Sequence, residues 1–174
     1  MSDSKPFVLD ANAFIAPYRQ YYAFDLVPAY WEAIKPFINS GRVLLVDLVK
    51  KELDKGGDSL AKWLNDNEEI TVIGRANNDV LMKYQQIIRY ISSCGFYTQN
   101  GIRVWSGTSI ADPWLIAVAA VYGYTIVTLE VPIDNLSTKN RTNKIKIPDV
   151  AKHFGVETIN VFEMMRRLGV VITK

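Results

Sequence analysis

Short runs of apolar, largely β-branched residues recur along the chain, and they constrain its fold more than any other feature. They cover residues 7–9, 43–46 and 124–129, with weaker runs at 70–73 and 158–161. The first two are continuously apolar, as expected for strands that are buried on both faces. Between the runs lie segments with helical spacing or helix-boundary residues, at 28–37, 47–55, 59–65, 77–93, 112–122 and 148–154. This alternation predicts an α/β fold: three α/β/α layers around a central, mostly parallel sheet.

Length and composition limit the possible chemistry. The 174 residues correspond to about one domain, and we expect a single domain over residues 1–174. Twenty Lys and Arg residues nearly balance eighteen Asp and Glu residues, so the net charge does not by itself indicate a nucleic-acid partner. The one cysteine excludes an internal disulfide, and the one histidine excludes a multi-histidine metal site. Chemistry in this chain therefore has to use carboxylates, hydroxyls or lysines.

No membrane segment is expected. The first residues lack the basic and apolar regions of a secretory signal. The most apolar stretch, residues 114–129, is shorter than the roughly 20 residues of a spanning helix and is interrupted by Gly123. We therefore predict a soluble protein of the cytoplasm.

Four carboxylates occupy positions that differ from those of the other acids. Asp10 and Glu130 follow predicted strands, Glu52 lies in the helix after the second strand, and Asp112 begins the most apolar helix. In a parallel sheet, the carboxyl ends of strands and the N-termini of the following helices converge on one crevice. Carboxylates gathered there repel one another unless a cation lies among them. An all-oxygen set without histidine or thiol favours Mg²⁺ or Mn²⁺ over Zn²⁺, and such ions assist phosphoryl chemistry.

Each of these acids also has an ordinary structural interpretation. An aspartate after a strand is often a turn residue, and an aspartate before proline, such as Asp112, is often an N-cap. A glutamate early in a helix favours the helix dipole. Only the joint placement of the four points to a site.

The ordered set of motifs resembles the PIN domain superfamily, and within it the small stand-alone prokaryotic proteins that include VapC-type toxins. The matching segments are 8–12 (VLDAN), 46–53 (VDLVKKEL), 110–117 (IADPWLIA) and 126–130 (IVTLE). The resemblance implies a PIN-like fold and a Mg²⁺- or Mn²⁺-dependent ribonuclease. It further implies that Asp10, Glu52, Asp112 and Glu130 are the catalytic and metal-binding acids. Thr128 and Asn12 correspond to supporting polar residues.

The chain departs from the family pattern in three places. The fourth acid is usually aspartate, and the longer Glu130 can reach the metal directly, bind it through water, or leave a single-metal site. Asp149 is a spare candidate, although its place after a proline favours a helix cap. The aromatic segment 18–31 and the loop 131–147 exceed the compact toxins.

The resemblance also implies partners: an RNA substrate, an antitoxin protein and a second copy of the chain in a homodimer. The stretch 139–146 holds four basic residues and no acid, and Lys139, Arg141 and Lys144 are candidates for phosphate contacts. A solvated surface loop explains this stretch equally well. The tryptophans are expected in the core rather than as platforms for bases.

Two other functions remain open. A PIN-like module that binds RNA or protein without cutting is one alternative, and the unusual Glu130 leaves room for it. The second is a phosphohydrolase of the haloacid-dehalogenase kind, because Asp10 follows a strand. That chemistry requires an aspartate two residues after the nucleophile, where this chain has Asn12.

Overall fold

A five-stranded parallel sheet forms the centre of the computed structural model, which describes residues 5–67 and 69–172. The strand order is β3-β2-β1-β4-β5, and every pair is parallel. The strands are β1 (Phe7–Leu9), β2 (Val43–Val46), β3 (Val72–Ile73), β4 (Thr125–Val127) and β5 (Thr158–Ile159). The expected α/β fold with a mostly parallel sheet is confirmed. The last three strands are shorter than their apolar runs, because these runs continue beyond the ladder at their ends.

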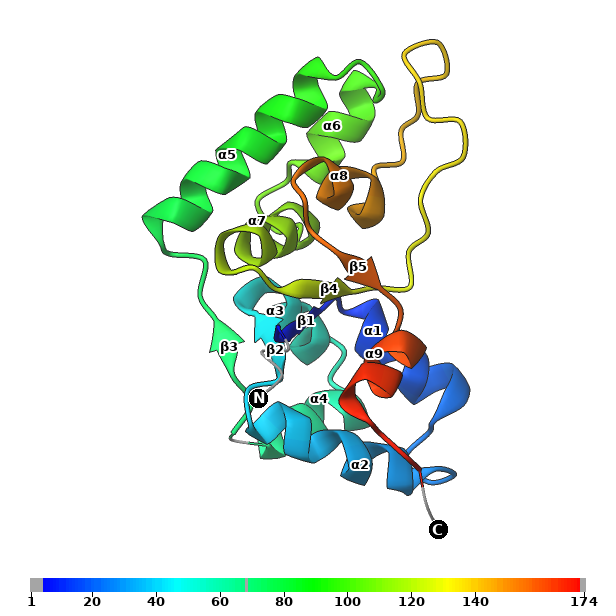
Figure 1. The fold of residues 1–174 in the computed structure, drawn as a ribbon. Coiled ribbons are helices and arrows are strands. Elements are labelled where there is room, and N and C mark those ends of the chain that lie inside the picture. The colour runs from blue at the N-terminus through cyan, green and yellow to red at the C-terminus, as the bar shows by residue number, and fades with distance from the viewer. Residues whose placement is uncertain (1–4, 68, 173–174) are drawn as a thin grey trace.

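Helices cover both faces of the sheet, which gives the three expected layers (Figure 1). One layer holds α5 (Asn78–Ser93), α6 (Gln99–Trp105), α7 (Asp112–Tyr122) and α8 (Ile147–His153). The other holds α1 (Asn12–Ala16), the π-helical turn η1 (Pro17–Tyr21), α2 (Pro28–Asn39), α4 (Ser59–Asp66) and α9 (Val161–Leu168). Helix α3 (Asp47–Lys55) starts directly at the end of β2.

Helix α7 forms the centre of its layer and packs on α5, on α8 and on the sheet. Pro113 lies in its first turn, where a missing N–H costs nothing. Its residues from Leu115 to Ala119 are at most 1% exposed. Gly123 ends the helix with a φ of 73°, a left-handed conformation that favours glycine. The apolar sequence of α7 therefore reflects contacts on several sides. These contacts fix the orientation of the helix and hence the position of its N-terminus.

Helix α6 was not expected from the sequence, because its seven residues carry little apolar periodicity. The Thr98 side chain caps it by accepting from the N–H of Gly101. A Cβ on Gly101 would lie 2.6 Å from the carbonyl oxygen of Asn143, so only glycine allows the loop after β4 to approach this closely. Backbone hydrogen bonds between Thr142 and both Phe96 and Thr98 hold the same loop. The predicted loop 131–147 is thus anchored against α6.

The aromatic segment 18–31 is part of the packed layer below the sheet. Tyr22 stacks on Tyr30 with ring centroids 4.2 Å apart, and Phe24 stacks on Trp31 at 4.4 Å. Trp31 is 1% exposed, as expected for a core residue. No helix among the described residues is long and apolar enough to cross a membrane. Residues 1–4, which belong to the segment used for the expectation about a secretory signal, lie outside the described residues.

Candidate active site

The candidate site lies at the carboxyl edge of the sheet, beside the two central strands. The chain runs outward from β1 to β2 and β3, and then returns to add β4 and β5 on the other side of β1. The ends of β1 and β4 therefore mark the point at which the strand order reverses, where ligands bind in open α/β sheets. Asp10 directly follows β1 and Thr128 directly follows β4. The topology thus brings together residues from distant parts of the sequence.

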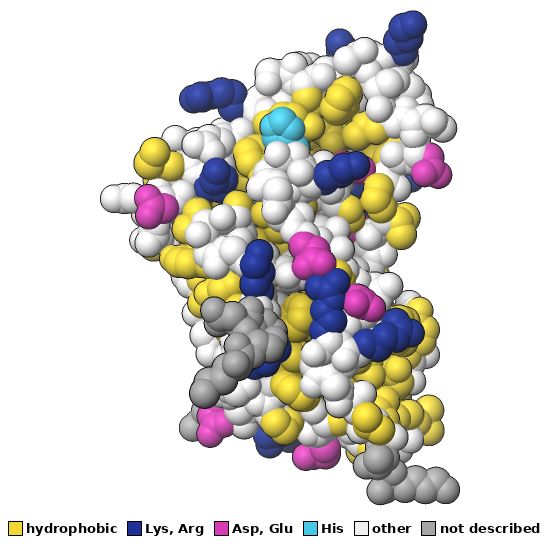
Figure 2. Space-filling view, viewed as in Figure 1, with side chains coloured by type: hydrophobic (Ala, Val, Ile, Leu, Met, Phe, Trp, Pro, Cys, Tyr) yellow, Lys and Arg dark blue, Asp and Glu magenta, His cyan; other side chains and the backbone are white. Residues whose placement is uncertain are grey.

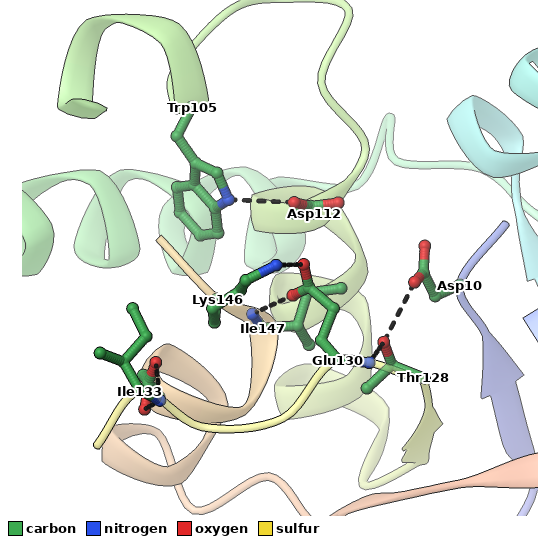
Figure 3. A network of polar contacts seen from close by, with 9 residues as sticks. Asp10, Trp105, Asp112, Thr128, Glu130, Ile133, Lys146 and Ile147 are labelled. Atoms are coloured by element: carbon green, nitrogen blue, oxygen red, sulfur yellow. Dashed lines mark hydrogen bonds and ion pairs between the residues drawn. The ribbon is translucent and has the colours of Figure 1, made fainter. Parts of the chain in front are cut away.

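Asp10 is buried and held in one orientation. Its side chain belongs to a residue that is 6% exposed, and its backbone N–H donates to the carbonyl oxygen of Val127 at 2.9 Å. The Thr128 hydroxyl donates to Oδ2 of Asp10 at 3.0 Å. The same hydroxyl oxygen accepts the N–H of Glu130 at 3.1 Å, which fixes the direction of the hydroxyl proton (Figure 3). Thr128 therefore orders the first acid, in the place that the resemblance gave to a supporting residue.

Asp112 also has one oxygen fixed by a neutral donor. The indole Nε1 of Trp105 donates to its Oδ2 at 3.0 Å (Figure 3). The N-cap role considered for Asp112 is wrong: Ala111 occupies the N-cap position, and no side chain caps the helix. The indole contact and the first helical turn hold the carboxylate at the site instead.

The other two acids lie at the edges of this pair. Glu52 is exposed on the second turn of α3 and lines, together with Asp112, a hollow of about 500 Å³. Glu130 accepts the Lys146 ammonium at 2.6 Å on Oε1 and the N–H of Ile147 at 2.8 Å on Oε2. It lines a second hollow of about 620 Å³ with residues of β5 and α9. Asn12 is exposed at the start of α1.

The charges of the four acids act on one another. Burial raises the pKa of Asp10 to about 7, with further increases from the charges of Asp112, Glu130 and Glu52, although the Thr128 hydrogen bond opposes the shift. Burial likewise raises the pKa of Asp112 to about 6, with contributions from Glu130 and Glu52. The Trp105 hydrogen bond and the Lys146 ammonium act in the opposite direction. The predicted set of four therefore forms one electrostatic unit.

Asp10 and Asp112 each keep one carboxylate oxygen that is available to a hard divalent cation. Thr128 and Trp105 each bind the Oδ2 of one aspartate, and within the described part of the chain neither Oδ1 takes part in a hydrogen bond. The described residues contain no group of three or more acidic, histidine or cysteine side chains close enough to hold an ion together. Mg²⁺ commonly binds through one or two carboxylates and keeps several waters, so a pair is sufficient for it.

The basic residues of the long loop do not join this site. Lys139, Arg141 and Lys144 are exposed on the segment anchored to α6. Over the face in Figure 2, lysine and arginine side chains are spread among acidic ones and do not form one patch. The structure therefore leaves them as surface residues near the path of the loop.

Sequence reasoning missed two residues that contact the acids. Trp105 lies seven residues before Asp112 on the unexpected helix α6, and a buried indole N–H that needs a partner was the available signal. Lys146 lies between Ile145 and Ile147, which are 6% and 1% exposed, and this apolar flanking could have separated it from the solvated lysines. Asp149 does not cap α8 but accepts the N–H of Ile133 at 3.2 Å, which fastens the start of the loop.

Comparisons with known proteins agree with the fold. A family model described as "Domain of unknown function (DUF4411)" matches residues 7–172. No curated protein matches the sequence. Among solved structures, a chain in the crystal structure of DNA-bound VapBC from Salmonella typhimurium matches with a TM-score of 0.52 and 15% identity, covering 91% of this chain and 99% of that chain. At this identity the likeness concerns the fold, and it confirms the PIN-like architecture expected from the motifs.

Proposed function

The chain belongs to the DUF4411 family, a domain of unknown function, and we propose that it is a metal-dependent ribonuclease that hydrolyses RNA phosphodiester bonds at the Asp10–Asp112 site. The cofactor in this proposal is Mg²⁺ or Mn²⁺. Glu52 and Glu130 complete the acidic site, and Thr128 orders it.

One observation carries the proposal. The buried Asp10 and the partly buried Asp112 both have raised pKa values, and the charge of Asp112 adds to the shift of Asp10. The hydrogen bonds that the two carboxylates receive come from neutral groups, a hydroxyl and an indole. Such an arrangement costs folding stability at neutral pH, because like charges are withdrawn from water close to one another. Groups that oppose folding in this way are typical of functional sites. A divalent cation would relieve the cost.

The roles of the side chains follow from their positions. When bound, Mg²⁺ or Mn²⁺ supplies Lewis acidity, which lowers the pKa of a water molecule and offsets the charge of a phosphate. Asp10 and Asp112 would hold the ion, while Thr128 and Trp105 keep these carboxylates from rotating. Glu52, exposed in the hollow beside Asp112, is available to accept a proton or orient a water. The resemblance adds the expectation of 5′-phosphate and 3′-hydroxyl products.

An acidic site repels the phosphates of RNA, so substrate affinity requires positive charge outside the site. We assign it to Lys139, Arg141 and Lys144, because they are exposed on one loop that ends at Lys146, which contacts the site directly. Phosphate contacts of this kind bind RNA without sequence preference and weaken with salt.

We also propose that the protein is the toxin of a toxin–antitoxin pair, with a homodimer of this chain and an antitoxin as partners. The support is the fold: the VapBC structure that it resembles is described as a DNA-bound complex. The site residues do not depend on this part of the proposal.

The test is cleavage of end-labelled single-stranded RNA by the purified protein in Mn²⁺, Mg²⁺ or EDTA, beside the Asp112→Asn variant. We expect cleavage in either metal, none in EDTA and none in the variant, since the asparagine keeps the shape but removes a charge. Normal cleavage by Asp112→Asn would contradict the assignment. Absence of both cleavage and Mn²⁺ binding would favour the non-cutting binding module.

A further inference from the structure

Glu130, the acid that departs from the usual aspartate, is already engaged by the chain's own donors. The Lys146 ammonium lies 2.6 Å from Oε1, and the N–H of Ile147 lies 2.8 Å from Oε2. The side chains of Glu130 and Lys146 are 18% and 32% exposed, so the pair is partly withdrawn from water. Both oxygens of the fourth acid therefore face donors from the end of one loop.

The position of Lys146 is fixed by its neighbours rather than by its own flexible side chain. Ile145 and Ile147 are buried on either side of it, and α8 starts at Ile147. Asp149, in the first turn of α8, accepts the N–H of Ile133 and so ties the start of the same loop to the helix. The packed backbone therefore holds Lys146 beside the site, whereas the lysines earlier in the loop are exposed.

The influence of Lys146 reaches beyond Glu130. Its charge also acts on Asp112, where it partly offsets the rise in pKa that burial causes. In Figure 3 the Lys146 side chain extends toward Glu130 on the side that faces Asp112. An ammonium has three N–H donors, and the described residues take one of them, through Glu130. The others remain for an anionic ligand such as a phosphate oxygen.

Enzymes that cut phosphodiesters with two metal ions place positive charge on both the attacking and the leaving oxygen. Here the fourth acid of the site is paired with the ammonium of a lysine from the same chain. We propose that Lys146 is the built-in second cation of this site, held by Glu130, so that the protein binds a single divalent ion at Asp10 and Asp112. Glu130 is then a positioning residue, and Lys146 contacts the scissile phosphate. This inference rests on the proposed function and specifies how that site handles charge.

The number of bound ions tests the inference without any measurement of activity. Mn²⁺ is titrated calorimetrically into the full chain and into Lys146→Met, Lys146→Arg and Lys152→Met. Lys152 is an exposed lysine of α8, so its variant matches the charge change away from Glu130. We expect one ion per chain for the wild type, for Lys146→Arg and for Lys152→Met. Lys146→Met should bind two, because Glu130 is released and the repelling ammonium is gone.

The outcomes separate the two proposals. Two ions in the wild type, or one ion in a Lys146→Met protein that melts with a normal cooperative transition, would overturn the role of Lys146 alone. No ion in the wild type would overturn the metal site and the inference together. If Lys146→Met does not fold, Glu130→Gln provides the second test. It removes the negative charge that holds the ammonium, and we expect it to keep one ion while lowering the rate of cleavage at saturating Mn²⁺. An unchanged rate in that variant would contradict a positioning role for Glu130.

Discussion

The two ends of β4 carry similar hydrogen bonds in opposite electrostatic settings. At the carboxyl end, the Thr128 hydroxyl donates to Asp10 at 3.0 Å; at the amino end, the Thr125 hydroxyl donates to Glu157, also at 3.0 Å. Glu157 additionally forms a two-pronged ion pair with Arg167, at 2.8 and 3.0 Å, which lowers its pKa. Asp10 is buried among other acids, and its pKa is raised.

The difference indicates which acid serves the fold and which serves chemistry. A carboxylate with a bidentate arginine is satisfied by the protein itself, and its charge contributes to stability. A buried carboxylate whose charged neighbours are mainly acids opposes folding in its ionised form, and it becomes favourable when a cation arrives. Four predictions use this contrast, and a fifth concerns the basic loop.

The rate of RNA cleavage should show the largest difference between variants of Asp10 and Glu157. We expect Asp10→Asn to lower the rate of Mn²⁺-dependent RNA cleavage by at least ~100-fold, since even supporting residues around a metal contribute roughly 10- to 100-fold. Glu157→Gln makes the same charge change at the opposite sheet edge and should leave the rate unchanged. Equal losses in both variants would remove the distinction between the two ends of β4.

The same two variants should change stability with opposite signs in EDTA. Because the pKa of Asp10 is raised to about 7 from 3.8, the folded state loses stability as the pH rises through this window. Asp10→Asn should therefore exceed the wild type in free energy of unfolding at pH ~8, by about 2 to 4 kcal/mol, with little difference near pH ~4. Denaturant unfolding at both pH values measures this. An Asp10→Asn protein that is less stable than the wild type at the higher pH would contradict the raised pKa.

Glu157→Gln is the counterpart, and its exposure limits the effect. The lowered pKa of Glu157 means that its charge stabilises the folded state at neutral pH, and that this contribution is lost as the pH falls through its folded-state pKa. We expect a loss of about 1 kcal/mol or less, because the side chain is half exposed and screened. A gain in stability would contradict a stabilising role for the charge of Glu157.

Replacing each threonine with the isosteric valine tests the hydrogen bonds alone. Thr128→Val removes the donor to Asp10 and leaves the N–H of Glu130 without its acceptor. We expect Mn²⁺ affinity to fall about tenfold, the lower range for a residue that orients a metal ligand. Thr125→Val should leave Mn²⁺ affinity unchanged, as measured by the same calorimetric titration. A tenfold loss in both would point to a general effect of β4 packing.

The smallest effect is expected from the basic loop, because its residues lie outside the acidic site. Neutralising Lys139, Arg141 and Lys144 together should weaken RNA binding at low salt several-fold and reduce the salt dependence of binding, since phosphate contacts release counter-ions. Cleavage at saturating RNA should not change. RNA affinity equal to that of the wild type at low salt would mean that these residues form only a solvated surface.

The sequence predicts the framework well because strand burial and strand order act through local patterns. The apolar run of β2 and the left-handed glycine after α7 have the bounds that the pattern indicates. The meeting of Asp10 with Thr128 follows from parallel strand pairing, although they are 118 residues apart. These parts needed only periodicity and topology.

The remaining contacts depend on tertiary packing that no local pattern encodes. Helix α6 lacks apolar periodicity, so the Trp105 contact with Asp112 could not be anticipated from the spacing of the acids. The position of Lys146 depends on the close approach of its loop to Gly101. No local sequence pattern predicts a contact between these two segments. The preference of Asp112 for an indole over its own helix N-terminus is likewise a packing effect, and it overturned the expected cap.

Anomalous diffraction at the manganese edge, from crystals grown with MnCl₂, tests the central claim most directly. We predict one manganese peak per chain, in contact with the carboxylates of Asp10 and Asp112, and no peak at Glu130 while Lys146 is present. A manganese peak at Glu130 would contradict the account. So would the absence of a peak at Asp10 and Asp112 in crystals grown with MnCl₂.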